Sequence, residues 1–278
     1  MANKGLISLD ELVGQIGDGA MLAVPPDYSG VAMAATVSLI RRGVRRLHLV
    51  AVPTSGLQAE WLIGGGCVST LEAAAITLGE FGPAPCFAEG IRAGAFVMKD
   101  STCPAVHAAL QAAEKGVPFM PLRGLIGSDI LKHRHDWQVI DNPFSAQDPI
   151  VLLPAIKPDF ALFHALLGDR HGNVWIGRRR ELMTMAHAAA ASLVTVERIY
   201  DGDLLADETM AAGCLPGLYV QSLAHVPRGA WPLGFADEYA LDADEVRRYL
   251  QRARSPDGFR SYIADWDRPG SHDVVAAE

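Results

Sequence analysis

The sequence predicts an α/β fold with an open, largely parallel sheet that is covered by helices. Apolar runs rich in Val, Ile and Leu alternate along the chain with amphipathic runs of helix length, and Gly or Pro separates them. The strand runs are continuously apolar, as in parallel strands that are buried on both faces. The chain has 278 residues, 50% of them hydrophobic, which is enough to bury a full α/β core.

The first part of the fold follows from local signals. Ser8 and Glu11 form a capping box, which predicts a short helix near the start of the chain. A buried strand is expected over residues 20–24, followed by a helix over residues 31–42 that ends at Gly43. Strand, loop and helix together make the first βα unit.

Two more βα units follow in the same style. A strand over residues 47–52 precedes a helix over residues 57–63, and a third strand starts near Cys67. Residues 95–98 are expected to form a strand, and a helix runs from Pro104 in its first turn to Lys115. The alternation supports a parallel sheet with helical crossovers.

The middle of the chain is less regular. The apolar segment 117–122 leads into a polar turn at residues 127–129. Periodicity then fades between residues 131 and 147, where we expect a solvated or substrate-covering loop. The sheet is expected to resume at residues 150–153.

The stretch around which the chain is organised is the apolar run 160–167 and the polar turn after it. Asp169 and Asn173 lie in this turn, and a second strand starts at Val174. Ligands of open α/β sheets bind outside the carboxyl ends of the strands, so Asp169 and Asn173 are predicted to shape a site. A hairpin corner without a ligand explains the same residues equally well.

The last third contains shorter elements. We expect a helix over residues 181–191, a strand over residues 193–196 that ends at the charged pair Glu197-Arg198, a strand over residues 218–220, and a helix over residues 243–252. These complete a single α/β domain over residues 1–254. Residues 255–278 show no periodic pattern, and we expect this C-terminal tail to wrap around the surface or a partner.

Composition excludes several classes of function. The net charge is −8 and the isoelectric point is about 5.6, so neither nucleic acid nor an anionic membrane is expected as a partner. No apolar run reaches about 18 residues and the start lacks a signal-peptide core, so we expect a cytoplasmic protein. The triple glycine at residues 64–66 lacks the Lys-Ser/Thr ending of a phosphate loop.

No metal site is predicted. His133 and His135 stand beside Asp136, but two histidines two residues apart cannot face one site on a helix, and no third ligand is identifiable. The four cysteines are widely spaced and form no C-x-x-C pair, so we expect reduced, structural thiols.

Five motifs resemble, in order, those of the alpha subunit of family I CoA-transferases, with the A subunits of glutaconate CoA-transferases as the nearest variety. They are Gly17-Asp18-Gly19-Ala20-Met21-Leu22, Val117-Pro118-Phe119-Met120-Pro121-Leu122-Arg123 with Gly127-Ser128-Asp129, Asp169-x-x-Gly172-Asn173, Val196-Glu197, and Pro227-x-Gly229-Ala230. The resemblance spans about two hundred residues and covers nearly the whole chain.

The resemblance implies a subunit that needs a partner. In this family a glutamate attacks the acyl-CoA thioester and carries CoA to a second acid through covalent intermediates, which divides one difficult transfer into easier steps. In two-subunit members this glutamate belongs to the beta chain, in a Ser-Glu-Asn-Gly type motif that the present sequence lacks. We therefore expect a homologous beta subunit in a heterodimer or heterotetramer, acyl-CoA as the substrate, and no cofactor other than this coenzyme A.

Two departures from the family pattern bear on the activity. Where the family commonly has Gly-Gly-Phe after the first strand, this chain has Pro25-Pro26-Asp27, and proline has no N–H to donate to an oxyanion. Related ring-opening CoA hydrolases of steroid-derived thioesters use an acid of the alpha chain, whose place is taken here by Cys103. Cys103 is predicted to line the acyl pocket without being the covalent catalyst.

The predicted substrate-binding residues come from these loops, while the catalytic residue is assigned to the partner. They are Pro26, Asp27, Cys103, Gly127, Ser128, Asp169 and Asn173. The alternatives to a CoA-transferase alpha chain are a ring-opening type of CoA-thioester hydrolase subunit, and a binding or regulatory module that kept the fold without the chemistry.

Overall fold

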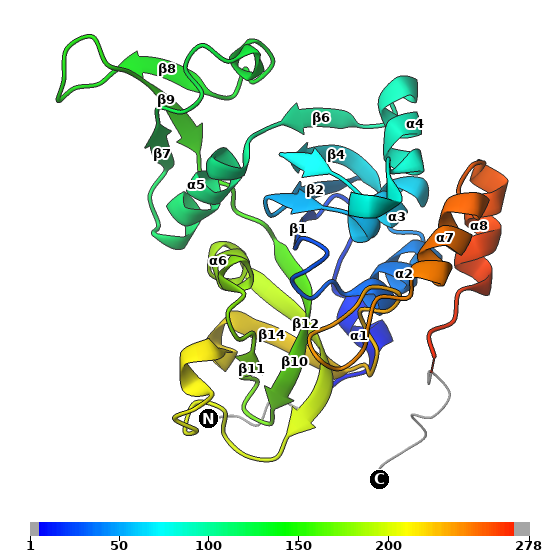
Figure 1. Cartoon of the computed structure of the whole chain (residues 1–278). Coiled ribbons are helices and arrows are strands. Elements are labelled where there is room, and N and C mark those ends of the chain that lie inside the picture. Colours follow the sequence, from blue (N-terminus) through cyan, green and yellow to red (C-terminus); the bar gives the residue numbers. More distant parts are fainter. Residues whose placement is uncertain (1–5, 270–278) are drawn as a thin grey trace.

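Seven parallel strands form the body of the main sheet in the computed structural model, which describes residues 6–269. Across the sheet their order is β6 (Val97–Asp100), β4 (Val68–Ala73), β2 (Leu47–Ala51), β1 (Met21–Val24), β10 (Phe160–Asp169), β12 (Ala191–Tyr200) and β14 (Val220–His225). The short strands β11 (Val174–Trp175) and β13 (Cys214–Leu215) extend it antiparallel from the end of β10. The predicted open, largely parallel sheet is confirmed (Figure 1).

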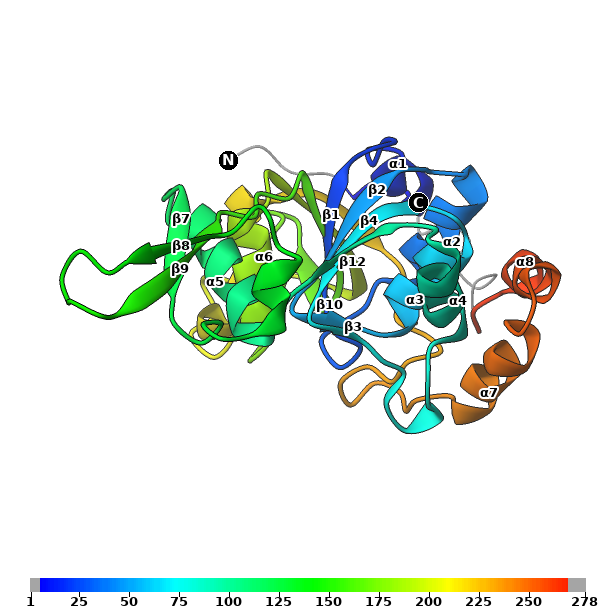
Figure 2. The ribbon, with the colours of Figure 1, turned by 90° about the horizontal axis from the view of Figure 1, so that it is seen from above.

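Helices cover both faces of this sheet, as Figures 1 and 2 show. On one face lie α1 (Leu9–Val13), α2 (Met33–Arg42), α3 (Leu57–Gly64), α4 (Pro85–Ala93), α7 (Ala243–Arg252) and α8 (Pro256–Asp265), and on the other lie α5 (Cys103–Glu114) and α6 (Arg180–Ala188). Successive strand residues point to opposite faces. Leu22 and Val24 of β1 therefore enter the first core, whereas Ala23 enters the second.

The local signals for the first helices are confirmed. Ser8 and Glu11 form the capping box of α1, and Gly43 ends α2 in a left-handed conformation with φ of 74°. Asp242 caps α7 by accepting a hydrogen bond from the Glu245 amide. Each signal needs only neighbours in sequence, which is why the sequence alone reveals it.

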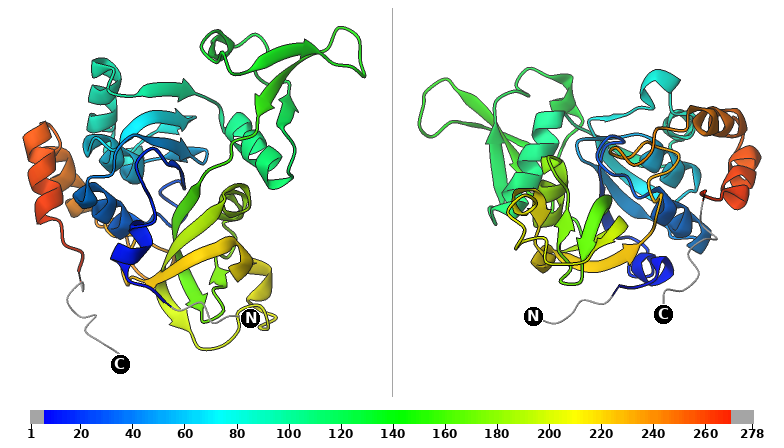
Figure 3. Two further views of the ribbon diagram at one scale, coloured as in Figure 1. Left: turned by 180° about the vertical axis from the view of Figure 1, so that it is seen from behind. Right: turned by 60° about the horizontal axis from the view of Figure 1, so that its bottom comes forward.

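The prediction that the main sheet resumes at residues 150–153 is wrong. These residues belong to a separate antiparallel sheet of β7 (Phe119–Leu122), β9 (Pro149–Pro154) and β8 (Gln138–Asp141). We call this sheet with its connections, residues 117–154, the arm; it stands away from the body in all views (Figures 1–3). An apolar run predicts a strand, but it does not tell which sheet the strand joins.

Other boundaries also differ from the prediction. β12 continues to Tyr200, so Glu197 and Arg198 lie within the strand and not at its end. The strand expected at residues 218–220 begins only at Val220, after the 3-10 turn η4 (Gly217–Tyr219). Residue-level boundaries depend on long-range pairing that sequence periodicity does not contain.

The expectation that residues 255–278 have no periodic pattern is wrong for residues 256–265, which form α8. Ser255 caps α8 and Pro256 occupies its first turn, so the start signals are present. Phe259, Tyr262 and Ile263 of α8 are buried in the first core. Residues 270–278 lie outside the described part of the chain.

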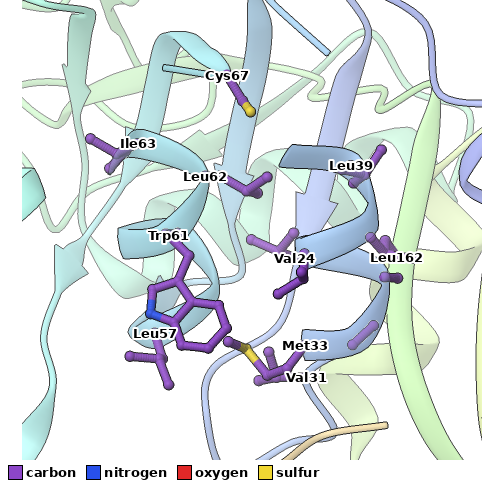
Figure 4. Packing of buried hydrophobic residues seen from close by; sticks show 14 of the residues in the cluster. Val24, Val31, Met33, Leu39, Leu57, Trp61, Leu62, Ile63, Cys67 and Leu162 are labelled. Atoms are coloured by element: carbon purple, nitrogen blue, oxygen red, sulfur yellow. The ribbon is translucent and has the colours of Figure 1, made fainter. Parts of the chain in front are cut away.

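An aromatic cluster fixes α7 and α8 to the first core, part of which Figure 4 shows around Trp61. The Trp61 ring lies 5.5 Å from both Tyr249 of α7 and Tyr262 of α8, and 6.0 Å from Trp266. These are favourable tilted and edge-to-face arrangements at contact distance. The C-terminal helices are therefore packed onto the same body as the sheet.

The remaining elements are short. They are β3 (Thr54–Ser55) paired in parallel with β5 (Ala75–Ile76), and the 3-10 turns η1 (Gly79–Phe81), η2 (Asp129–Lys132) and η3 (Ala211–Gly213). β3, η1 and the loop after β1 lie at the carboxyl ends of the parallel strands. They are the segments from which the site described next is built.

Candidate active site

The strand order reverses between β1 and β10. From β1 the chain proceeds to β2, β4 and β6 on one side, and from β10 it proceeds to β12 and β14 on the other. The loop after β1 stays beside β10, because the His164 amide donates a 2.7 Å hydrogen bond to the Gly30 carbonyl. Open α/β sheets bind their ligands at such a switch point, outside the carboxyl ends of the strands. The loop over residues 25–30 is therefore the centre of the candidate site.

This loop separates two cavities that meet at Tyr28, whose exposed fraction is 63%. The Asp27 cavity, of about 300 Å³, is lined by residues 26–28, 54–57, 77–81, Leu233, Leu241 and Val246. The Arg179 cavity, of about 710 Å³, is lined by residues 28–30, 164–166, 175–179, Leu182 and 234–237. Both are lined by the loop that follows the carboxyl end of β1.

The wall of the Asp27 cavity is mostly apolar. Four residues of the first core line it, namely Leu57, Leu78, Leu233 and Val246. Its two charged lining residues, Asp27 and Glu80, are both acidic. This cavity combines a hydrocarbon surface with negative charge.

Asp27 also supports the start of α3. Its carboxylate accepts hydrogen bonds from the Gly56 amide at 3.2 Å and the Leu57 amide at 3.0 Å. A Cβ at Gly56 would lie 2.1 Å from the Asp27 Oδ2, so only glycine fits there. Burial raises the pKa of Asp27 to about 6, although the two amides favour the charged form.

The Arg179 cavity is lined by two arginines and one acid, Asp237. Arg178 and Arg179 line it, and neither forms an ion pair within residues 6–269. The Arg179 guanidinium lies 5.4 Å from the ring centroid of Tyr28. Unpaired guanidinium groups beside a cavity favour a carboxylate or phosphate ligand.

A buried hydrogen-bond network supports the floor of the Arg179 cavity. His164 of β10 is fully buried; its Nε2 lies 2.9 Å from Glu197 Oε2 and its Nδ1 lies 2.9 Å from Thr195 Oγ1. The Arg228 amide donates a 2.7 Å hydrogen bond to the same carboxylate, and the Tyr239 hydroxyl donates another. The network joins β10 and β12 to the loop that covers the cavity.

The protonation states of this pair follow from its surroundings. Burial lowers the pKa of His164, which favours the neutral ring. Burial alone would raise the pKa of Glu197, but hydrogen bonds from His164 and the Arg228 amide hold it below its ordinary value. A neutral His164 then donates from Nε2 to the ionised Glu197 and accepts from Thr195.

Sequence reasoning missed His164. It lies inside an apolar strand run, which is the usual surrounding of a structural residue. Glu197 stands in the Val196-Glu197 motif, but its partner lies 33 residues earlier in the sequence. Only the pairing of β10 with β12 brings the two side chains together.

A second polar group lies at the rim, between the loop and two helices. The Ser29 hydroxyl donates a hydrogen bond to Glu181 of α6. Burial lowers the pKa of His107 on α5, while the nearby Glu181 carboxylate raises it. Cys103 is the exposed first residue of α5, one turn before His107 on the same helix face.

The structure brings together only some of the predicted site residues. Pro26 and Asp27 line the Asp27 cavity, whereas Cys103 lines neither cavity. Gly127 and Ser128 lie at the base of the arm, where Ser128 Oγ accepts a 3.1 Å hydrogen bond from the Ile130 amide. These residues stand apart from the switch-point loop in the single chain.

Asp169 and Asn173 form the corner of the β10–β11 hairpin. The Asp169 carboxylate accepts hydrogen bonds from the His171, Asn173 and Leu204 amides, and from the Asn173 side chain. Asn173 Oδ1 accepts one from the Gly217 amide. Both side chains are buried and line neither cavity, so the cavities give no support to their assignment as substrate-binding residues.

Residues 6–269 contain no group of three or more His, Cys, Asp or Glu side chains arranged to hold a metal ion. Within the same range, no helix is both long and apolar enough to cross a membrane.

Similarity to known proteins identifies the family. No model of a protein family matches the chain. The chain is 30% identical over 271 residues to the A subunit of the 3-oxoadipate CoA-transferase of Pseudomonas knackmussii, and the match covers 95% of this chain and 93% of that protein. The chain belongs to the family of family I CoA-transferase alpha subunits. The resemblance found in its motifs is thereby confirmed, and the chain is an enzyme subunit.

Two other relatives of this alpha subunit carry different names. It is 27% identical to the cholesterol ring-cleaving hydrolase IpdA subunit of Rhodococcus jostii, over 98% of this chain and 94% of that one. An uncharacterized protein of Archaeoglobus fulgidus is 29% identical over 95% of this chain, and the chain spans 59% of its length. Relatives named as subunits imply that the alpha subunit has a partner subunit.

Solved structures agree on the fold. Glutaconate coenzyme A-transferase from Acidaminococcus fermentans superposes with a TM-score of 0.85 at 23% identity, over 94% of this chain and 88% of that one. A variant of the decarboxylase AibA/AibB superposes with a TM-score of 0.81 at 30% identity, over 95% of this chain and 100% of that one. The alpha-subunit fold is therefore shared by proteins named for different reactions.

Proposed function

We propose that this alpha subunit works with a homologous beta subunit, in a heterodimer or heterotetramer, to transfer CoA between acyl-CoA thioesters and carboxylic acids. The beta subunit supplies the nucleophilic glutamate, and the alpha subunit binds the thioester at the loop over residues 25–30. Coenzyme A enters as part of the substrate, and no other cofactor takes part. The absence of a Ser-Glu-Asn-Gly type motif from the 278 residues supports this division.

The observation that carries the proposal is the Arg179 cavity at the switch point. It holds Arg178 and Arg179 without acidic partners in the described residues, and its floor is fixed by the His164–Glu197 pair. Charge-assisted hydrogen bonds from arginine suit the phosphate groups of CoA. The thioester then lies close to Tyr28, between the anionic part of the substrate and its acyl group.

The first two residues of the loop over residues 25–30 cannot form part of an oxyanion hole. Pro25 and Pro26 have no N–H, so neither stabilises negative charge on the thioester oxygen. Those donors then come from elsewhere in the assembled enzyme. This requirement is a further reason to place part of the active site on the partner.

A CoA-thioester hydrolase is the second candidate, favoured by the polar group at the rim. Glu181 accepts from Ser29 and lies near His107, which is an arrangement that can take a proton from an attacking water. The acid used by ring-opening hydrolases is replaced by Cys103, so their mechanism does not transfer directly. The two reactions differ in whether a carboxylate acceptor is needed.

Co-expression with a homologous beta subunit tests the proposal. We expect a stable complex that turns over acyl-CoA only when a carboxylate acceptor is added. Release of free CoA without an acceptor would instead establish the hydrolase. Enzyme-like turnover by the purified alpha chain on its own would contradict both, because each needs the glutamate or other donors of the partner.

A further inference from the structure

The Asp27 cavity has features that a general CoA site does not require. Its residues come from loops after β1 and β3, from η1, and from the C-terminal segment over residues 233–246. The segment is held in place by a 3.1 Å hydrogen bond from the Trp231 indole to Asp242 and by the burial of Val246 on α7. The C-terminal segment therefore gives the cavity a fixed apolar part of its wall.

Charge at the rim distinguishes this cavity from its neighbour. Glu80 is exposed on η1 and forms no ion pair within residues 6–269, and no lysine, arginine or histidine of that range lines the cavity. Asp27 adds a second carboxyl group to the lining. A carboxylate inside this cavity would meet like charge with no cation of the lining to balance it.

We infer that the Asp27 cavity receives the acyl group and selects a short hydrocarbon chain over a chain that ends in a second carboxylate. The apolar wall of Leu57, Leu78 and Val246 favours burial of methylene and methyl groups. Glu80 and Asp27 disfavour a terminal carboxylate. This inference rests on the proposed function, and it names the substrate class of that site.

Two six-carbon thioesters that differ only at the far end make the direct test. Hexanoyl-CoA ends in a methyl group and adipyl-CoA ends in a carboxylate, and both carry the same CoA. Calorimetry with the alpha–beta complex measures the dissociation constant of each, and a turnover assay with an acetate acceptor follows separately. We expect hexanoyl-CoA to bind at least about tenfold more tightly.

Failure of this inference can be told apart from failure of the proposed function, because binding is measured separately from turnover. Equal or tighter binding of adipyl-CoA overturns the inference, whether or not the complex transfers CoA. Tighter binding of hexanoyl-CoA than of adipyl-CoA supports the inference. If turnover does not then depend on an acceptor, the proposed transferase reaction is contradicted.

A charge reversal provides the second arm. Glu80→Lys places a cation at the rim without breaking an ion pair of the described residues, so we expect the preference for hexanoyl-CoA over adipyl-CoA to fall about tenfold. Glu208→Lys is the matched control, because Glu208 is exposed and lines neither cavity. An identical preference ratio in both variants would overturn the inference.

A change of volume provides the third arm. Leu241 is half-buried on the cavity wall, and Leu241→Phe fills part of the space that the acyl chain would occupy. We expect the preference to shift from hexanoyl-CoA toward acetyl-CoA by about tenfold, at an unchanged melting temperature. Leu218→Phe, at an 85% exposed position outside both cavities, should leave the ratio unchanged. Equal ratios in the two variants would place the acyl chain elsewhere.

Discussion

The two cavities on either side of Tyr28 are built by the same loop, yet they differ in chemistry. The Asp27 cavity has a hydrocarbon wall and two acids, whereas the Arg179 cavity has one acid, Asp237, and two arginines that form no ion pair within the described residues. An acyl-CoA thioester has the same division, with an apolar acyl end and an anionic CoA end. If the proposed function holds, the difference means that one short loop at a switch point separates the two ends of the substrate.

They also differ in what holds them together. The Arg179 cavity rests on the buried His164–Glu197 pair in the centre of the sheet. The Asp27 cavity rests on the Asp27 carboxylate at the start of α3 and on the C-terminal segment. Substitutions can therefore break one cavity while leaving the other intact.

Glu197→Ala should have the largest effect, and it acts on the Arg179 side. It leaves the N–H of buried, neutral His164 and the Arg228 amide without their acceptor. Each unsatisfied buried donor costs about 1–3 kcal/mol, so we expect a loss of about 2–6 kcal/mol in the free energy of unfolding. Urea unfolding of the alpha subunit measures it, with exposed Glu208→Ala as the control. A loss no larger than that of the control would mean that the network does not support the cavity.

Gly30→Ala should disturb both cavities at once. Gly30 has φ of +87°, and its Cβ would lie 2.1 Å from the His164 carbonyl oxygen, so the loop must move away from β10. We expect a loss of about 2–4 kcal/mol, together with loss of substrate binding. Gly19→Ala is matched, with φ of +82° and no atom within 4 Å, and should cost only about 1 kcal/mol. Equal losses would show that the contact with β10 is not needed.

Asp27→Asn tests the Asp27 cavity through the pH dependence of the free energy of unfolding. The folded-state pKa of Asp27 is about 6 against an ordinary 3.8, so the native state binds the proton more tightly. Wild-type stability relative to Asp27→Asn should therefore fall as pH rises from about 4 to 6, by up to about 3 kcal/mol. Urea unfolding of both proteins at several pH values measures the difference. A constant difference, or one that grows with pH, would contradict the raised pKa.

Arg179→Gln should weaken the binding of CoA in the Arg179 cavity and leave the Asp27 cavity unaffected. Removal of this guanidinium is expected to raise the Kd for free CoA by about tenfold or more, as one lost charge-assisted hydrogen bond predicts. The preference for hexanoyl-CoA over adipyl-CoA should stay as in the wild type, because the change lies across Tyr28 from the acyl group. Calorimetry measures both quantities. A changed preference with unchanged CoA affinity would reverse the assignment of the two cavities.

Cys103→Ser should have the smallest effect. Cys103 lines neither cavity in the single chain, so we expect at least about a tenth of the activity of the complex to remain. Steady-state kinetics measures this, with mass spectrometry to look for an acyl group on the thiol. A thousandfold loss or a trapped acyl-cysteine would make this chain a thiol enzyme.

Much of the fold could be predicted from the sequence because its signals are local. The capping box at Ser8, the glycine that ends α2 and the apolar run of β10 each need only near neighbours. The arm could not be predicted, because β9 looks like any apolar strand until its pairing with β7 and β8 is known. Helix α8 has local signals as well, because Ser255 and Pro256 mark its start and Phe259, Tyr262 and Ile263 recur at helical spacing, so the expectation of a tail without a periodic pattern overlooks it.

The candidate site was predictable only in part. Pro26 and Asp27 follow a buried strand where the family has Gly-Gly-Phe, and this resemblance singles them out. The switch point itself depends on the pairing of β1 with β10, which the sequence does not show. The walls of the Asp27 cavity also come from η1 and from residues 233–246, and no sequence pattern joins segments so far apart. Asp169 and Asn173 carry the composition of a ligand turn, but their hydrogen bonds show how the same residues build a hairpin corner.

A crystal structure of the alpha–beta complex with a thioether analogue of hexanoyl-CoA tests the central claim most directly. We expect the hexanoyl chain to lie against Leu78 and Val246 in the Asp27 cavity, with CoA passing Tyr28 and its phosphates near Arg178 and Arg179. An acyl chain in the Arg179 cavity, or CoA phosphates beside Glu80, would contradict the claim.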